Sequence, residues 1–259
     1  MTDQIRFDDG ANYERYMGVW SRLVGERFVD WLGIPAGKRW LDIGCGNGAF
    51  TELLLARSCP AAVAGIDPSA PQLEYARKLP ALADVDLRLG DAQELPFADH
   101  SFDVAVMPLV LFFVPDPARG VAEMQRVVER GGWVAAYAWD MPGGGFPYEP
   151  VREAVIAMGI EVPAPPSPHA SSQASMQALW QEAGLGQLEC TTISVQRRYA
   201  DLEDYWQTLL GAPSIGARLA ALADEQQKQL RAQLPDLLHP AEDGSITCSG
   251  LANAVKGRV

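Results

Sequence analysis

The sequence has little basic charge and no long apolar run. Its 259 residues hold 21 Lys and Arg against 33 Asp and Glu, a formal net charge of −12. That balance argues against a nucleic-acid partner, because binding to a phosphate backbone needs clustered cations. A membrane-spanning helix needs roughly 20 consecutive apolar residues, and no stretch of the sequence provides them. We therefore expect neither nucleic acid nor a membrane span.

Paired cysteines and clustered histidines are also missing. The four cysteines have no C-x-x-C spacing and the three histidines are dispersed, so neither a disulfide framework nor a metal site is expected. The first residues do not read as a signal peptide. Reduced thiols in a cytoplasmic protein are the simplest interpretation. The residues concerned are Cys45, Cys59, Cys190 and Cys248, and His100, His169 and His239.

The sequence does contain a glycine-rich turn. Residues 40–50 read W-L-D-I-G-C-G-N-G-A-F, in which an apolar strand breaks into three alternate glycines and residues 49–57 then read as a helix. Glycine allows unusual backbone angles and lets a ligand lie against the main chain. A tight turn that binds nothing would need only one glycine. The three therefore predict a turn that holds a nucleotide cofactor.

The carboxylate before this turn indicates which cofactor. Dinucleotide-binding turns use G-x-G-x-x-G with a pyrophosphate over the helix start, whereas here the pattern is D-x-G-x-G-x-G. An acid at that position repels a pyrophosphate and suits an ammonium group. The segment resembles motif I of the class I S-adenosylmethionine-dependent methyltransferases. The resemblance implies that Asp42, Gly44, Cys45, Gly46 and Gly48 lie around the methionine part of the cofactor.

A second acid follows the next strand. Residues 62–67 form an apolar run that ends in Asp67, about 20 residues past the glycines, where doubly wound nucleotide sites place a carboxylate on the ribose hydroxyls. A plain turn residue before Pro68 is the alternative, but the spacing favours the ribose role. Ser69 then opens a helix with the pattern of a capping box, and we include Pro68 and Ser69 in the cofactor site.

Two further strands complete the expected cofactor site. Residues 85–89 read as a strand followed by Gly90, Asp91 and Ala92, and the resemblance implies that Asp91 and Ala92 lie beside the adenine. Asp91 alone could equally be a turn carboxylate. Residues 104–107 read as a fourth strand, which places Met107 at the carboxyl edge where such sheets bind ligands. Phenylalanines in residues 111–116 replace the paired histidines often found there in the family, so no histidine-based proton transfer is expected.

An aromatic helix is expected at the N-terminus. Residues 12–32 carry large apolar side chains at three- and four-residue intervals, the pattern of an amphipathic helix. Phe28 and Trp31 are expected to pack on the sheet. Tyr13, Tyr16 and Trp20 could instead lie over the cofactor as a lid, and we include Tyr16 and Trp20 among the cofactor-binding residues.

The order of the elements predicts the fold. Five alternations of strand and helix within about 100 residues favour an α/β fold with a doubly wound, mostly parallel seven-stranded Rossmann-like sheet and helical cap insertions. We expect a helical lid in residues 1–36, a cofactor-binding core in 37–140, and the remaining strands with the cap in 141–259. In the last part, helices are expected at 149–160, 175–183, 201–210 and 215–234, and strands at 188–199 and 245–255.

Within the resembled family, the closest likeness is to the small-molecule group that includes ubiquinone- and menaquinone-pathway methyltransferases. The resemblance implies S-adenosyl-L-methionine as cofactor and transfer of its methyl group, by in-line displacement, to a small and partly apolar acceptor. No catalytic residue can be named; Tyr148 and His239 are candidates only because they titrate or form hydrogen bonds. A non-catalytic S-adenosylmethionine-binding regulator and an NAD-dependent oxidoreductase are the alternatives. The acceptor, the methylated atom and the oligomeric state stay open.

Overall fold

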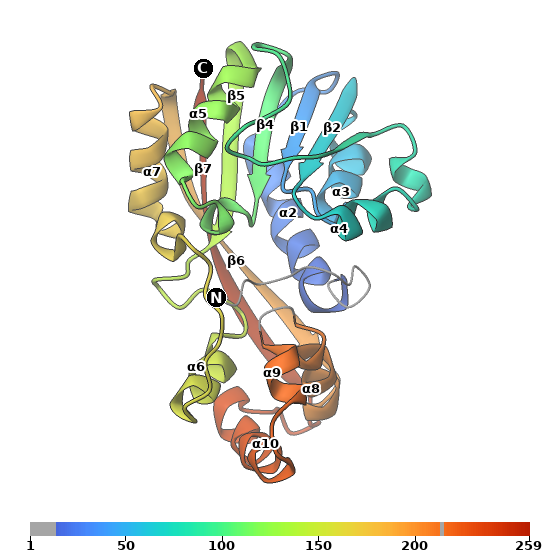
Figure 1. Ribbon diagram of the computed structural model, residues 1–259, viewed down its shortest axis with the longest axis vertical. Helices are drawn as coiled ribbons and strands as arrows, with labels where there is room; N and C mark the ends of the chain where they lie inside the picture. Colours follow the sequence, from blue (N-terminus) through green and yellow to red (C-terminus); the bar gives the residue numbers. More distant parts are fainter. Residues whose placement is uncertain (1–13, 213–214) are drawn as a thin grey trace.

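A single twisted sheet of seven strands organises the protein. The structure is a computed structural model that describes residues 14–212 and 215–259. The strand order is β3-β2-β1-β4-β5-β7-β6; β1 to β5 pair in parallel, and β7 runs antiparallel to both β5 and β6 (Figure 1). The order reverses beside β1, so the sheet is doubly wound. The predicted fold class is confirmed.

The strands and helices follow the predicted alternation. The strands are β1 (Arg39–Ile43), β2 (Ala62–Asp67), β3 (Asp86–Leu89), β4 (Phe102–Pro108), β5 (Val128–Trp139), β6 (Gly186–Tyr199) and β7 (Ile246–Arg258). The α-helices are α2 (Val19–Leu32), α3 (Ala49–Ser58), α4 (Ala70–Ala76), α5 (Pro117–Val127), α6 (Glu149–Ala157), α7 (Gln173–Glu182), α8 (Leu202–Leu210), α9 (Gly216–Ala220) and α10 (Asp224–Leu238). No helix among the described residues is both long and apolar enough to cross a membrane.

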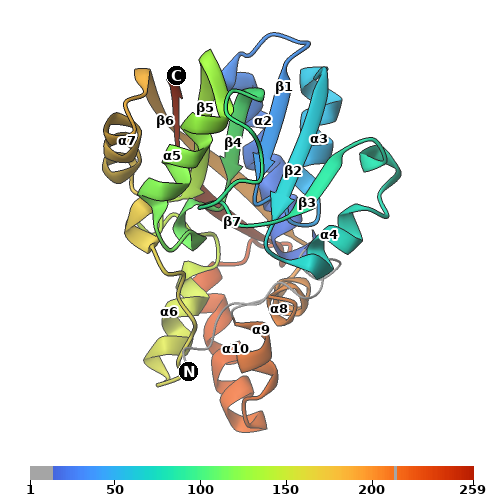
Figure 2. The ribbon, with the colours of Figure 1, turned by 45° about the horizontal axis from the view of Figure 1, so that its top comes forward.

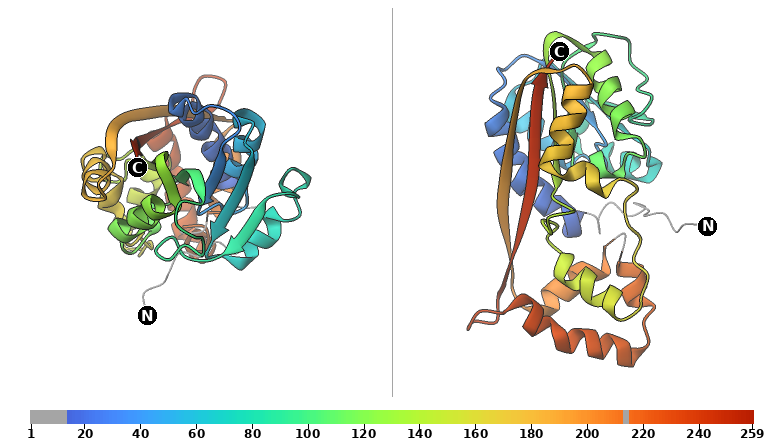
Figure 3. Two further views of the ribbon diagram at one scale, coloured as in Figure 1. Left: turned by 90° about the horizontal axis from the view of Figure 1, so that it is seen from above. Right: turned by 90° about the vertical axis from the view of Figure 1, so that its left-hand side faces the viewer.

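The central strands are apolar because helices cover them on both faces. In β4, residues 104–107 are all fully buried, as expected for a parallel strand between two helical layers. The helices α2 and α3 pack together, as do α5 and α7. Figure 3 shows these two pairs on opposite sides of the strands. Both faces of the sheet are therefore covered, and polar side chains that bind a ligand have to lie at the ends of the strands.

The N-terminal helix begins with a wider turn. Glu14–Gly18 forms a π-helical turn (η1) that continues directly into α2. Phe28 is fully buried in the core, which confirms its predicted packing role. Tyr13, which we expected in the lid, lies outside the described residues. Figure 1 places the start of α2 at the carboxyl ends of the strands, on the side of the molecule that faces the cap.

A helical cap stands beyond those carboxyl ends (Figures 1 and 2). It consists of α6, inserted after β5, and of α8, α9 and α10, inserted between β6 and β7. The β6–β7 ladder extends from Gly186 opposite Arg258 to Tyr199 opposite Ile246, and it joins the sheet to the cap. One prediction was wrong: residues 215–234 form two helices, because a turn at residues 221–223 separates α9 from α10, which packs on α6.

Candidate functional site

The glycine turn between β1 and α3 needs glycine at three positions because of its backbone angles, and at two of them also because there is no space for a side chain. Gly44, Gly46 and Gly48 all have positive φ angles, of 73°, 53° and 87°, which side chains rarely adopt. A Cβ on Gly44 would lie 2.3 Å from Val110 Cγ2, and one on Gly48 would lie 2.3 Å from Leu82 Cδ1. A Cβ on Gly46 would meet nothing closer than 3.9 Å. Gly46 is thus the point where a ligand can approach the main chain.

Four backbone N–H groups of the turn are already hydrogen-bonded to other atoms of the protein. The pairs are Gly44 N and Cys45 N to Ile66 O (2.7 and 3.1 Å), Gly46 N to Asp67 Oδ2 (2.9 Å) and Gly48 N to Cys45 O (2.9 Å). An anion at a helix start binds through available N–H groups. Because these four donors already have acceptors, the turn is poorly suited to a pyrophosphate. Like the carboxylate of Asp42, this argues against a dinucleotide cofactor.

Asp42 lies at the end of β1 behind this turn, with no exposed surface. Its Oδ2 accepts a hydrogen bond from Thr51 Oγ1 at 2.6 Å, while Oδ1 is buried with no partner among the described residues. Burial raises the pKa of Asp42 to about 7, and the nearby Asp67 carboxylate adds to the rise. A buried acid with one oxygen unpaired requires a cationic or donor group, and an ammonium group meets that need.

Asp67 lies at the end of β2, next to the turn. Its Oδ2 accepts from Gly46 N at 2.9 Å and its Oδ1 from Ser69 N at 2.8 Å. Burial raises the pKa of this carboxyl group, and the two amide hydrogen bonds oppose the rise. Two main-chain donors fix the carboxylate, and because a carboxylate has about four lone-pair sites, both oxygens can still accept hydroxyl groups.

The expected adenine segment follows the same edge. Gly90 N donates to Asp67 O at 3.1 Å, so Asp91 and Ala92 come directly after a residue that contacts the end of β2. Asp91 is exposed, and its Oδ1 accepts from Gln93 N at 2.8 Å. Pro68 is exposed, and the Ser69 hydroxyl caps α4 by accepting from Gln72 N at 3.4 Å. The structure thus brings these residues to one edge of the sheet.

The side chains of two expected site residues, Cys45 and Met107, are packed in the protein core. Cys45 is buried in a small second core with Leu73, Ala76, Leu82 and Leu87, and burial raises the pKa of its thiol. Only its backbone lies in the turn. Met107 is fully buried, and its Cε lies 3.7 Å from the place of a Cβ on Gly120 in α5. The Met107 side chain therefore belongs to the core.

The N-terminal turn reaches the glycine turn directly, a contact that sequence reasoning missed. Glu14 Oε2 accepts from Asn47 Nδ2 at 3.2 Å, and its other oxygen pairs with Arg22. The Asn47 Oδ1 in turn accepts from Ala49 N at 3.3 Å, at the start of α3. No local pattern signals the pairing, because Glu14 and Asn47 are 33 residues apart.

The same N-terminal segment also contacts the cap side. The Tyr16 ring stacks on Tyr148, with centroids 4.4 Å apart, and Trp20 Nε1 donates to Tyr148 Oη at 3.0 Å. Arg15 pairs with Asp204 of α8 at 3.0 Å. Tyr16 and Trp20 are buried, so both lie between the sheet and the segments that lead into the cap.

Of the two residues considered as proton acceptors, Tyr148 does not fit that role, and His239 stays a candidate. Tyr148 Oη donates to Tyr16 O at 2.8 Å, lies 2.9 Å from Tyr199 Oη, and has its pKa raised to about 12 by burial. Its proton is committed to a structural hydrogen bond. His239 is exposed at the end of α10, within the cap. Among the described residues, no group of three potential metal ligands occurs.

The chain is similar in sequence and in fold to known methyltransferases. The family described as "Methyltransferase domain" matches residues 41–136. A demethylmenaquinone methyltransferase from Staphylococcus aureus is 34% identical over 139 residues, which cover 53% of this chain and 56% of that protein. The chain thus matches only about half the length of its curated relatives.

Two solved structures share the fold. One is a putative methyltransferase from an antibiotic biosynthesis pathway of Anabaena variabilis, with a TM-score of 0.64, 17% identity, and coverage of 92% of this chain and 99% of that chain. The other is phosphoethanolamine N-methyltransferase 2 from Haemonchus contortus in complex with S-adenosyl-L-methionine, with a TM-score of 0.60, 18% identity, and coverage of 96% and 56%.

Proposed function

We propose that this chain, whose residues 41–136 match the methyltransferase domain family, is a class I S-adenosylmethionine-dependent methyltransferase that transfers a methyl group from S-adenosyl-L-methionine to a small, partly apolar acceptor. The observation that carries the proposal is the glycine turn: its four amide donors at Gly44, Cys45, Gly46 and Gly48 are already hydrogen-bonded within the protein, and two buried carboxylates, Asp42 and Asp67, lie close to the open Gly46. That surface suits a cationic, hydroxyl-bearing ligand.

The proposed role of each residue follows from its surroundings. Asp42 would hold the ammonium end near Gly44 and Gly46, and the Asp67 oxygens would accept the ribose hydroxyls. Asp91 and Ala92 would border the adenine. S-adenosyl-L-methionine, when bound, supplies a methyl group on a sulfonium that is already activated for nucleophilic attack. The chain has to align the acceptor and exclude water, and such positioning can supply roughly 7–11 kcal/mol of the barrier.

Of the N-terminal segment 1–36 expected as a lid, we propose that the turn Glu14–Gly18 covers the cofactor while α2 packs on the core; residues 37–140 form the cofactor-binding core, and residues 141–259 the remaining strands and the cap. Two contacts support the lid. Glu14 bonds Asn47 in the glycine turn, and Tyr16 stacks on Tyr148, just before the cap helix α6. The N-terminal turn therefore has one partner at the cofactor side and one at the cap side.

Three observations support a small and partly apolar acceptor. The side chains where the sheet meets the cap are largely aromatic, including Trp139, Tyr148 and Tyr205, all buried. The net charge of −12 disfavours polyanions. The curated relative from Staphylococcus aureus is named for methylation of demethylmenaquinone, which is a small molecule with an apolar portion.

The test combines calorimetric cofactor binding with a methyl-transfer assay. We expect S-adenosyl-L-methionine to bind and NAD not to bind, and we expect turnover on reduced demethylmenaquinone or a related small quinol. The Gly46→Val variant should keep the fold and lose cofactor binding, because its side chain would occupy the open side of the turn. Undiminished binding in this variant contradicts the site. Cofactor binding without turnover across a broad acceptor panel would instead indicate a non-catalytic regulator.

A further inference from the structure

Leu109, the residue that follows β4, has a left-handed backbone. Its φ angle is 58°, a region that a leucine rarely adopts because its Cβ comes too close to a carbonyl oxygen. Such a conformation persists only where the surroundings impose it, and it often occurs at functional sites. The strands β1 and β4 are parallel neighbours, so Leu109 lies at the same edge of the sheet as the glycine turn. None of the roles proposed above uses it.

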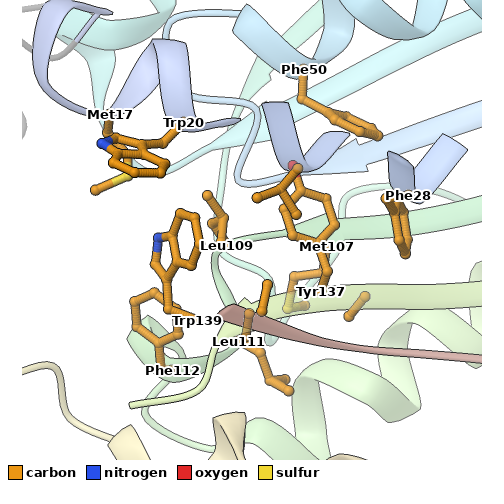
Figure 4. Packing of buried hydrophobic residues seen from close by; sticks show 14 of the residues in the cluster. Met17, Trp20, Phe28, Phe50, Met107, Leu109, Leu111, Phe112, Tyr137 and Trp139 are labelled. Atoms are coloured by element: carbon orange, nitrogen blue, oxygen red, sulfur yellow. The ribbon is translucent and has the colours of Figure 1, made fainter. Parts of the chain in front are cut away.

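Two contacts hold Leu109 in this conformation. Its N–H donates to Tyr137 O in β5 at 2.7 Å. Its side chain is only 6% exposed and belongs to the hydrophobic core, and Figure 4 shows it among the side chains of Trp20 and Trp139. The burial of the leucine side chain therefore offsets the unfavourable backbone angle.

The turn at Leu109 is followed by a residue that lies against the glycine turn. A Cβ on Gly44 would lie 2.3 Å from Val110 Cγ2 and 2.8 Å from Val110 Cγ1, so the valine side chain occupies the space next to the Gly44 main chain. Phe113 N donates to Val110 O at 2.7 Å, which fixes the chain after the valine. Val110 is half-buried, and part of its side chain therefore stays accessible to a ligand.

Val110 makes the two sides of the glycine turn different. It closes the approach to Gly44, whereas a Cβ on Gly46 would meet nothing closer than 3.9 Å. Asp42, to which the proposed function assigns the ammonium group, comes two residues before Gly44 in the sequence. Asp67, to which it assigns the ribose, bonds Gly46 instead. Val110 thus lies on the side of the turn where the amino-acid end of the cofactor is expected.

We propose that Leu109 is a positioning residue, whose left-handed backbone holds Val110 on Gly44, and that Val110 is the apolar wall along the methionine arm of the cofactor. This deepens the function proposed above and rests on it. The methionine arm carries methylene groups, which can pack on the valine methyl groups. Because the ribose and the adenine are assigned to Asp67 and Asp91, both residues should affect only one half of the cofactor.

The experiment compares two ligands that differ in this half. S-adenosylhomocysteine has the amino-acid end, and methylthioadenosine lacks it but keeps the ribose and the adenine. Isothermal titration calorimetry measures the affinity of the full chain for each ligand. Val110→Ala should weaken binding of S-adenosylhomocysteine by about fourfold, the scale of one buried methylene group, and should leave the affinity for methylthioadenosine unchanged.

A pair of substitutions at position 109 tests the backbone. Leu109→Gly and Leu109→Ala remove almost the same buried side chain, so both should lower the melting temperature. Glycine adopts the left-handed conformation readily, whereas alanine, without the packing of the leucine, should leave it. We therefore expect Leu109→Gly to bind S-adenosylhomocysteine like the wild type. Leu109→Ala should bind it about tenfold more weakly, the scale of a left-handed angle at a residue with a Cβ.

His100 provides the matched control, because it lies before the other end of the same strand. Its φ angle is also 58°, and it precedes Phe102, the first residue of β4, by two positions. Its side chain is exposed. His100→Gly and His100→Ala should leave the affinities for both ligands unchanged.

The outcomes separate this inference from the proposed function. The inference is overturned by an undiminished affinity of Val110→Ala for S-adenosylhomocysteine, by equal affinities of Leu109→Gly and Leu109→Ala, or by parallel losses for both ligands. A wild-type chain that binds neither ligand overturns the proposed function, and the inference with it. If the variants behave as expected but no acceptor is methylated, the positioning role stands and the proposed reaction fails.

Discussion

At the residue scale, hydrogen bonds from Gly46 N and Ser69 N fix the Asp67 carboxylate beside the glycine turn. We predict that Asp67→Ala weakens binding of S-adenosyl-L-methionine by about 1–3 kcal/mol, the scale of losing hydrogen bonds to a charged group. Isothermal titration calorimetry measures this directly. An unchanged dissociation constant would remove Asp67 from the site.

Asp103 provides the matched control for this substitution. It is also an aspartate of the central sheet, but its carboxylate bonds Arg39 Nε at 2.9 Å, and that hydrogen bond holds its pKa well below the usual range. Asp103→Ala should lower thermal stability and leave cofactor affinity unchanged. Equal losses of affinity in the two variants would indicate a general effect of unfolding rather than a ligand contact.

Asp42 predicts a pH dependence of cofactor binding. Its carboxyl group has a pKa of about 7 in the folded protein, and only the ionised form attracts an ammonium group. Affinity for S-adenosyl-L-methionine should therefore rise as the pH increases from about 6 to about 8, and Asp42→Asn should lose most of this dependence. Calorimetry across that range is the measurement; a flat wild-type profile would contradict the assignment.

The same group has the opposite effect on folding without cofactor. The ordinary pKa of 3.8 applies to the unfolded chain, while burial raises the pKa to about 7 in the folded state. Between these values the folded protein binds the proton more tightly. The contribution of Asp42 to the free energy of unfolding therefore decreases as the pH rises from about 4 to about 7. Added cofactor should oppose this loss.

At the element scale, the N-terminal turn Glu14–Gly18 contacts both the glycine turn and the cap. We predict that Glu14→Ala, which breaks the contact with Asn47 Nδ2, speeds cofactor dissociation by about tenfold or more, because a side-chain hydrogen bond to a charged group contributes about 1.5–3 kcal/mol. Stopped-flow fluorescence of the nearby tryptophans would measure the rate. Glu26→Ala, at an exposed position of α2, is the control and should not change it.

The elements that the sequence predicted well are those whose signals are local. Asp42 and Asp67 each end an apolar run before a turn, so the topology alone brings them to one edge. The break at residues 221–223 was missed because alanine and leucine favour helix on both sides of it. At this point α10 begins anew, with Gln226 Oε1 accepting a hydrogen bond from Ala223 N at 3.3 Å, and α10 packs on α6. The hydrogen bond between Glu14 and Asn47 also has no local signal in the sequence, because the fold brings these residues together. The same holds for the buried Nε1 of Trp139, which has no partner among the described residues.

At the scale of the whole molecule, β6 and β7 belong to the sheet and also connect to the cap. We predict one cooperative thermal transition, because the cap is held to the N-terminal turn and to β6 by contacts such as Arg15 with Asp204 and Tyr199 with Tyr205. Cofactor at about 100 times its dissociation constant should add about 2.7 kcal/mol to the free energy of unfolding. Calorimetry that resolved two transitions, only one of them responsive to cofactor, would show that the cap unfolds independently.

The insertion that carries α8 to α10 leaves the sheet after Tyr199 and returns at Ile246, and these two residues face each other in the β6–β7 ladder. The two ends of the insertion therefore lie side by side. A different helical segment could be spliced between the same two points without altering any strand of the cofactor domain. If the cap contacts the acceptor, as the proposed function implies, exchanging this single segment would change which acceptor is bound and leave the cofactor-binding strands intact.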